Sequence, residues 1–299
     1  MDWDNSWSAL VNPGRANNFF DFIHPGNIRP TQEYDPVNSL WFMEFSRLVY
    51  IRELDQRGKE TAGEKRNALL EHVGFRQAAF FANKESQCMI VEAKNDLGKN
   101  PIYIVVFRGT GRITEWKLNI NFRLIHWHRK NVKVHCGFEK GLRLIWKEVD
   151  SFLNNNKHDL LFFTGHSQGA AIATLAATVR PSTALYTFGS PRVGNENFEN
   201  SLSKIPIFRV VNCLDLVTQV PLKNSVGYSF KHIGESFYIN REGVLIRAAD
   251  LYVSNDRNKK GKIGKKTFNR RISVWDPPKI LSDHSAVNYS AHLESQLSN

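Results

Sequence analysis

The hydrophobic pattern of the first hundred residues predicts two helices followed by strands. Asp35 and Pro36 suit a helix cap and a first helical position, and the apolar residues that follow share one face: Val37, Leu40, Trp41, Phe45 and Leu48. Thr61 and Glu64 are spaced as a capping box for a second helix, which Gly74 would end. Strand-like runs follow at 78–82, 87–93 and 101–107.

Farther along, strand and helix patterns alternate. Strands are predicted at 132–135, 160–163, 184–188 and 207–211, and helices at 138–153, 168–179 and 196–202. Such alternation indicates an α/β fold, with a mostly parallel central sheet and helices on both faces. Shorter strands at 238–239 and 244–246 and a helix around 286–297 complete one domain, 35–299. An irregular arm, 1–34, precedes it, and we expect no enzymatic role there.

Composition narrows the class of protein. Of the 299 residues, 41% are hydrophobic, which excludes intrinsic disorder. No apolar run approaches the ~18 to 20 residues of a membrane span, and the acidic start Met1-Asp2-Trp3-Asp4 differs from a secretory signal. We therefore expect a cytoplasmic protein with at most peripheral membrane contact, and leave signal-independent export open. The cysteines lack metal or redox spacing and are expected to be buried thiols: Cys88, Cys136 and Cys213.

The most informative stretch is the G-x-S-x-G pattern of residues 165–169. It stands between a buried strand and an alanine-rich helix, which is the context of a nucleophile elbow. Gly165 and Gly169 have no side chains to clash where strand and helix pack closely, so Ser167 can adopt a strained conformation with its hydroxyl exposed. An ordinary glycine-rich turn is the alternative. The flanking elements favour Ser167 as a nucleophile.

A serine nucleophile needs a histidine base and a carboxylate that orients this histidine. In hydrolases of this topology the acid follows the serine and the histidine comes last. Asp215 follows strand 207–211, at the carboxyl edge of the sheet where sites form, and is our candidate acid. Its rivals stand in less regular segments, as solvated loop carboxylates do: Asp250, Asp276 and Asp283.

Ten histidines compete for the role of base. His284 lies in a loop just before the last helix, from which it can reach a serine at the sheet edge, and it is our candidate. Spacing alone does not exclude His232 or His292. The pair His126 and His128 lacks the neighbouring ligands of a metal site. Three others fall in surface-like segments: His24, His72 and His158.

Several segments resemble, in order, the motifs of the class 3 lipase family, the fungal triacylglycerol-lipase type of α/β-hydrolase. They are Phe107-Arg108-Gly109-Thr110, Val134-His135-Cys136-Gly137-Phe138, the elbow, Tyr186 to Asn195, Arg209 to Asn212, and Asp283-His284 before Tyr289. The resemblance spans roughly residues 35–296. It implies an α/β-hydrolase fold, a Ser167, Asp215 and His284 triad, the trio already reached from spacing, and no metal or organic cofactor.

The resemblance also implies an oxyanion hole made by the backbone N–H groups of Thr110 and Gln168, followed by a helical lid at about 111–125. Ile113, Trp116, Ile120 and Leu124 lie at helical spacing on one face, as a lid requires, although a helix packed permanently on the core has the same pattern. The chain departs from many family members at Gln168, where they have leucine, and at 216–221. Both changes would reshape the acyl pocket. The matches expected to be structural are His135, Arg192 and His232.

We therefore predict a serine carboxylic-ester hydrolase of acyl lipids, similar to triacylglycerol lipases. A phospholipase A1 or lysophospholipase acting on anionic membrane lipid is the first alternative. A catalytically silent module that binds lipid or protein is the second.

The net charge of +11 comes mainly from one segment, because eight bases and no acid lie within 257–271. Only Phe268 interrupts this basic insert, so the aromatic platforms of nucleic-acid binding are missing, and no nucleic-acid partner is expected. The insert is either a solvated loop or a contact with an anionic membrane surface. The oligomeric state is not determined by these patterns.

Overall fold

A computed structural model describes residues 4–15, 18–51, 61–83, 85–109, 123–202, 204–225, 228–259 and 279–297. Its centre is an eight-stranded sheet in the order β1-β2-β3-β6-β7-β8-β11-β12. The neighbours from β3 to β11 pair in parallel, whereas β1, β2 and β12 pair antiparallel at the two sides. The strands are β1 (Phe75–Ala82), β2 (Gln87–Ala93), β3 (Ile102–Phe107), β6 (Leu160–His166), β7 (Ala184–Phe188), β8 (Ile207–Asn212), β11 (Glu235–Ile239) and β12 (Leu245–Arg247).

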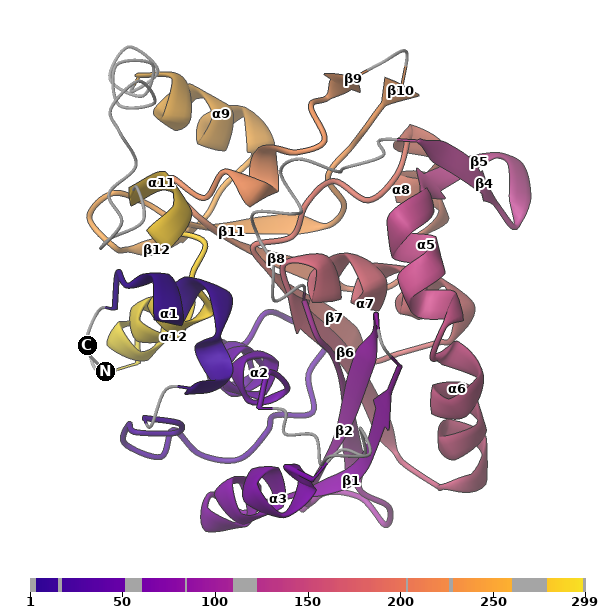
Figure 1. The fold of residues 1–299 in the computed structure, drawn as a ribbon, viewed down its shortest axis with the longest axis vertical. Helices are drawn as coiled ribbons and strands as arrows, with labels where there is room; N and C mark the ends of the chain where they lie inside the picture. Colours follow the sequence, from indigo (N-terminus) through magenta and orange to yellow (C-terminus); the bar gives the residue numbers. More distant parts are fainter. Residues whose placement is uncertain are drawn as a thin grey trace.

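Helices cover both faces of this sheet (Figure 1). Successive side chains of a strand point to opposite faces, so Ile104 and Val106 of β3 join one hydrophobic core while Tyr103 and Val105 join the other. The first core also contains apolar side chains of α2 (Pro36–Leu48), α3 (Gly63–His72) and α12 (Ala286–Ser295). The second contains those of α5 (Cys136–Arg143), α6 (Trp146–Asn155), α7 (Gln168–Val179) and α8 (Glu196–Ser201). The predicted mostly parallel α/β sheet is confirmed.

Helix α2 begins as the sequence predicts, because an Asp35 carboxylate oxygen accepts a hydrogen bond from the Asn38 N–H at 2.9 Å. Its burial differs from the prediction of one apolar face. Every side chain from 37 to 48 is buried, including Glu44 and Arg47. The reason is that the N-terminal arm and α12 cover the face of α2 that turns away from the sheet.

Three local predictions were wrong, and one helix was not predicted. Ala62, without a side-chain cap, precedes α3, so Thr61 and Glu64 form no capping box. The predicted helix 138–153 is divided into α5 and α6 at residues 144–145. Leu124 belongs to strand β4 (Leu124–Trp127), which pairs with β5 (Arg129–His135), and not to a lid helix. Helix α9 (Asp250–Lys259) takes up the first residues of the basic insert.

The remaining elements are short. They are α1 (Trp7–Val11), the 3-10 helices at Pro13–Arg15 and Val217–Gln219, strands β9 (Asn224–Ser225) and β10 (Tyr228–Ser229), and α11 (Lys279–Ser282). Cys88 and Cys213 are buried thiols, as predicted, while Cys136 is only half-buried, and none of the three forms a disulfide within the described residues. Among the described helices, none combines the length and hydropathy that crossing a bilayer requires.

Candidate active site

Ser167 occupies the sharp turn between β6 and α7. Its φ of +61° lies in the left-handed region, which is rare for a residue with a side chain. The turn is possible because glycines stand two residues before and two residues after Ser167. A Cβ at Gly169 would lie 2.1 Å from the Phe107 carbonyl oxygen, and one at Gly165 would lie 2.5 Å from the backbone of Gly169. The strained strand-to-helix turn predicted from the sequence is therefore present.

The structure brings Ser167, His284 and Asp215 together in one hydrogen-bonded chain. His284 Nε2 lies 2.9 Å from Ser167 Oγ, and its Nδ1 lies 2.8 Å from Asp215 Oδ2. A carboxylate can only accept, so Nδ1 carries the proton and Nε2 is free to accept the serine proton. Both the imidazole and the carboxylate are fully buried. This is the geometry required to activate a serine hydroxyl.

Asp215 has two further donors. The Tyr289 hydroxyl donates to Oδ2 at 2.8 Å, and the Val217 N–H donates to Oδ1 at 2.8 Å. Tyr289 in turn accepts from the Asn212 N–H at 2.8 Å. Burial, and next the charge of Asp215, raise the pKa of the Tyr289 hydroxyl well above its ordinary value, so it remains a donor. The sequence placed Tyr289 in a motif but assigned it no contact.

His166 packs behind His284, with ring centroids 4.6 Å apart. Its Nε2 donates to the His284 carbonyl oxygen at 2.8 Å. Burial, and next the nearby His284 ring, lower the pKa of His166 well below its ordinary value. His166 therefore stays neutral and holds the backbone of the histidine loop. Nothing in the sequence distinguished this role from the other positions of the elbow.

The two described rivals of Asp215 have other partners, and the third, Asp276, lies outside the described residues. Asp250 pairs with the buried Arg209, and Asp283 is buried, not solvated, with an oxygen 3.9 Å from Cys213 Sγ. His292 is buried in α12, and burial lowers its pKa to about 4. Burial, and next the charges of three arginines, lower the pKa of His232 well below its ordinary value. No group of three metal-ligating side chains occurs among the described residues.

Part of the predicted site lies outside the described residues. Thr110, the first oxyanion residue, and the lid residues Ile113, Trp116 and Ile120 belong to the segment 110–122. Gln168, the second oxyanion residue, is described and opens helix α7 directly after the serine. The oxyanion hole and the lid therefore remain predictions.

Arg257 has a position that the sequence did not indicate. It is the first base of the insert 257–271, yet its side chain turns back onto the loop that carries Asp215. Nε donates to the Cys213 carbonyl oxygen at 2.9 Å, and Nη2 donates to the Asn212 carbonyl oxygen at 3.0 Å and to Thr218 Oγ1 at 2.9 Å. Arg257 thus fixes the acid loop. Residues 260–271 of the insert lie outside the described part.

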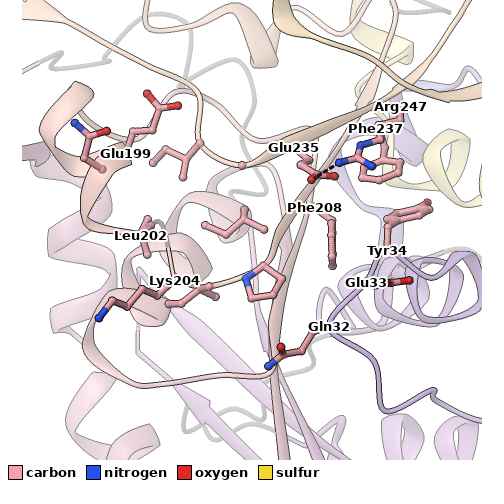
Figure 2. A pocket seen from close by; sticks show the side chains of 16 residues that line it. Gln32, Glu33, Tyr34, Glu199, Leu202, Lys204, Phe208, Glu235, Phe237 and Arg247 are labelled. Atoms are coloured by element: carbon pink, nitrogen blue, oxygen red, sulfur yellow. Dashed lines mark hydrogen bonds and ion pairs between the residues drawn. The ribbon is translucent and has the colours of Figure 1, made fainter.

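A cavity of about 990 Å³ lies at the opposite edge of the sheet from the serine. It is lined by residues at the starts of β8 and β11, Ile207 and Glu235, whereas Asp215 follows the end of β8. Figure 2 shows its aromatic side, where the ring of Tyr34 stacks on Phe237 at 3.7 Å between centroids, and the Glu235–Arg247 ion pair. Ser167, Asp215 and His284 do not line this cavity, so it is not the substrate site of the triad.

Comparison with known proteins agrees with the motifs. Residues 104–225 match the family model described as lipase (class 3). The chain is 32% identical to the lipase of Rhizomucor miehei over 186 residues, 56% of this chain and 50% of that protein. It is 32% identical to the chloroplastic phospholipase A(1) of Arabidopsis thaliana over 164 residues, 45% of this chain and 36% of that one. The aligned part thus spans half or less of these relatives' length.

Among solved structures, the mono- and diacylglycerol lipase of Aspergillus oryzae superposes with a TM-score of 0.61 at 19% identity, covering 88% of this chain and 99% of that one. This likeness shows the shared α/β-hydrolase fold. The segment that matches the family model includes Ser167 and Asp215 and ends before His284. In the structure, His284 lies within hydrogen-bond distance of both residues. Motifs and matched segment make residues 104–225 similar to the class 3 lipase family, and the shared fold extends this likeness over most of the chain.

Proposed function

We propose that this protein is a serine carboxylic-ester hydrolase of acyl lipids. The observation that carries the proposal is the buried Ser167, His284 and Asp215 chain, built on a strained strand-to-helix turn. The relatives are described as lipases or as a phospholipase A(1), which supports an acyl-lipid ester as the substrate class. No metal or organic cofactor is required by this chemistry.

The reaction proceeds through an acyl-enzyme. Ser167 Oγ attacks the ester carbonyl carbon while His284 Nε2 takes the hydroxyl proton. The tetrahedral intermediate collapses as His284 gives this proton to the leaving alcohol, and the C–O bond to the alcohol breaks. Water then attacks the acyl-serine with His284 again as the base, which releases the fatty acid. Asp215 keeps the imidazole oriented and stabilises it when it is charged.

The oxyanion forms next to the amino end of α7. We assign its donors to the backbone N–H groups of Gln168 and Thr110, as the family motif implies. A donor aimed at the developing charge is typically worth about 10² to 10³ in rate. The segment after Thr110 is proposed as a lid, and turnover that does not rise above the micellar threshold of the substrate would contradict a mobile lid.

A phospholipase A1 or lysophospholipase is the second candidate, favoured by the plant relative and by charge. The hairpin of β4 and β5 has a basic surface of its own. Arg123, Arg129 and Lys130 are exposed, and none forms an ion pair within the described residues. Each base near an anionic bilayer contributes about 1 kcal/mol to its binding. Neutralising the seven bases of the insert that follow Arg257 should weaken binding to anionic vesicles while the Arg257 contacts with the acid loop are kept, and unchanged binding would refute docking through the insert.

The test of activity compares wild type with Ser167→Ala on short and long p-nitrophenyl esters. We expect loss of hydrolysis and of labelling by a fluorophosphonate probe. Equal activity of the two proteins would refute the mechanism, and an unlabelled, inactive wild type would favour a silent lipid-binding or protein-binding module. A lipid panel analysed by mass spectrometry then separates neutral lipid from phospholipid as the substrate.

A further inference from the structure

We propose that the N-terminal arm holds the catalytic histidine loop in place, and that Ala9 and Leu10 of helix α1 are positioning residues for His284. The proposal rests on the proposed hydrolase function. It revises the expectation that the arm has no enzymatic role. The arm and the histidine loop both lie outside the segment 104–225 that matches the family model.

The first contact is made directly beside the histidine. Ser285, the residue after His284, is buried, and its hydroxyl donates to the Ala9 carbonyl oxygen at 3.2 Å. Leu10 packs on Leu281 in a small apolar cluster of its own, and both side chains are about 95% buried, with 4% and 5% exposed. Figure 1 shows α1 against the helices on either side of this loop, α11 and α12.

A second contact passes through Asn288 of α12, whose side chain is fully buried. Its Nδ2 donates to the Ser282 carbonyl oxygen at 3.0 Å and to Asn5 Oδ1 at 3.2 Å, and its Oδ1 accepts from the Asp4 N–H at 3.2 Å. One amide therefore ties the beginning of the arm to the beginning of the histidine loop.

The opposite side of the loop is held by the sheet. Asn212 Nδ2 donates to the Asp283 carbonyl oxygen at 3.1 Å, and His166 Nε2 donates to that of His284 at 2.8 Å. These two bonds hold the loop on the side that faces the sheet, whereas α1 of the arm covers its other side. Without α1, Leu281 and Ser285 would face water, and the loop would lose its packing on that side.

Positioning of this kind affects the chemical step more than substrate binding. A catalytic group displaced by about 1 Å can cost up to about 10²-fold in rate, and His284 must stay within hydrogen-bond distance of two partners at once. We therefore expect Leu10→Ala to lower kcat roughly 10-fold, to leave KM within about twofold, and to slow probe labelling of Ser167 by the same factor as kcat.

The matched control is Leu153→Ala in α6. Leu153 is 2% exposed and belongs to the core on the other face of the sheet, so its truncation destabilises the fold without touching the histidine loop. A second control, Ile23→Ala, changes an arm residue that is 91% exposed. All proteins are assayed at least 15 °C below their melting temperatures. Both controls should keep kcat within about twofold of wild type.

Hydrogen exchange of residues 281–285 gives a readout that does not depend on activity. Leu10→Ala should raise exchange in this loop, and Leu153→Ala should not. If Leu10→Ala does not fold, Ser285→Ala removes only the hydroxyl bonded to Ala9, with about a threefold fall in kcat expected.

The proposal is overturned if loop exchange is unchanged in the arm variant, or if kcat falls equally in Leu10→Ala and Leu153→Ala. An inactive, unlabelled wild type would instead refute the hydrolase function, while the exchange data would still decide whether the arm holds the loop.

Discussion

Replacing Glu44 by glutamine should destabilise the fold far more than breaking an exposed ion pair of the same length. Glu44 and Arg47 are both fully buried in α2, with 2.7 Å between Oε1 and Nη1. Glu44 Oε2 also accepts from the Phe20 N–H at 2.9 Å, and Oε1 accepts from the Ser290 hydroxyl. One carboxylate thus joins the arm, α2 and α12.

The magnitude follows from burial. Removing one partner of a buried pair leaves the other charge uncompensated, which typically costs about 3 to 5 kcal/mol. An unfolding entropy of about 2.1 cal/mol/K per residue gives roughly 0.6 kcal/mol/K for this chain. Glu44→Gln should therefore lower the melting temperature by roughly 5 to 8 °C.

The control is Glu92→Gln. Glu92 pairs with Arg76 at 2.6 Å, but these side chains are 24% and 59% exposed, and an exposed pair contributes only about 0 to 1 kcal/mol. The double variant Glu44→Leu, Arg47→Met removes both charges but also removes the acceptor of the Phe20 N–H and the Ser290 hydroxyl, so it should recover only part of the loss. Calorimetry at one pH measures all of these proteins. Equal shifts for Glu44→Gln and Glu92→Gln would refute the reasoning from burial.

Three further changes test other parts of the structure. Gly169→Ala places a Cβ 2.1 Å from the Phe107 carbonyl oxygen, so the elbow must shift. We expect kcat to fall at least about 10-fold. Wild-type kinetics of this variant would contradict the close approach of the two backbones. Asp215→Asn should lower kcat by about 10⁴-fold with KM little changed, since the imidazole loses the acceptor that sets its tautomer. The unfolded chain protonates His292 near its ordinary pKa of ~6.5, whereas burial lowers the folded pKa to about 4. Stability is therefore full above pH ~6.5 and falls toward pH 4, and urea titrations of His292→Gln should give a slope flatter by up to about 1.4 kcal/mol per pH unit.

The parts that the sequence predicts well are those fixed by local patterning. The continuous apolar run of β3 and the strand–helix alternation after residue 159 reflect strands buried on both faces, which few other arrangements allow. The elbow was predictable from local sequence as well, because two glycines four residues apart, between a strand and a helix, specify one sharp turn. Thr61 and Glu64 show the limit of local rules, since a spacing alone does not determine where a helix begins.

The contacts around the triad could not be read in this way. Tyr289 and Asp215 are 74 residues apart, and Ser285 and Ala9 are 276 apart. Such long-range contacts depend on how the helices and the arm pack on the sheet. The local sequence pattern around a buried residue such as Tyr289 or Leu10 is the same whether its side chain supports a catalytic site or only fills a core. The contacts of Arg257 could not be predicted, because the sequence shows it only as the first base of a basic segment. In the structure it lies in α9, and its side chain bonds to the backbone of the acid loop.

Two imidazoles stand 4.6 Å apart at the site, and their surroundings give only one of them the role of base. His284 has a carboxylate at Nδ1 and the serine hydroxyl at Nε2, so a proton taken from Ser167 places the positive charge beside Asp215. His166 uses its N–H for the His284 carbonyl oxygen and has no carboxylate partner, and burial keeps its pKa low. It therefore cannot compete for the proton, and a charge on it would oppose the charge that forms on His284. We therefore assign proton transfer to His284, while the neutral His166 ring holds the histidine loop from the sheet side through its bond to the His284 carbonyl oxygen.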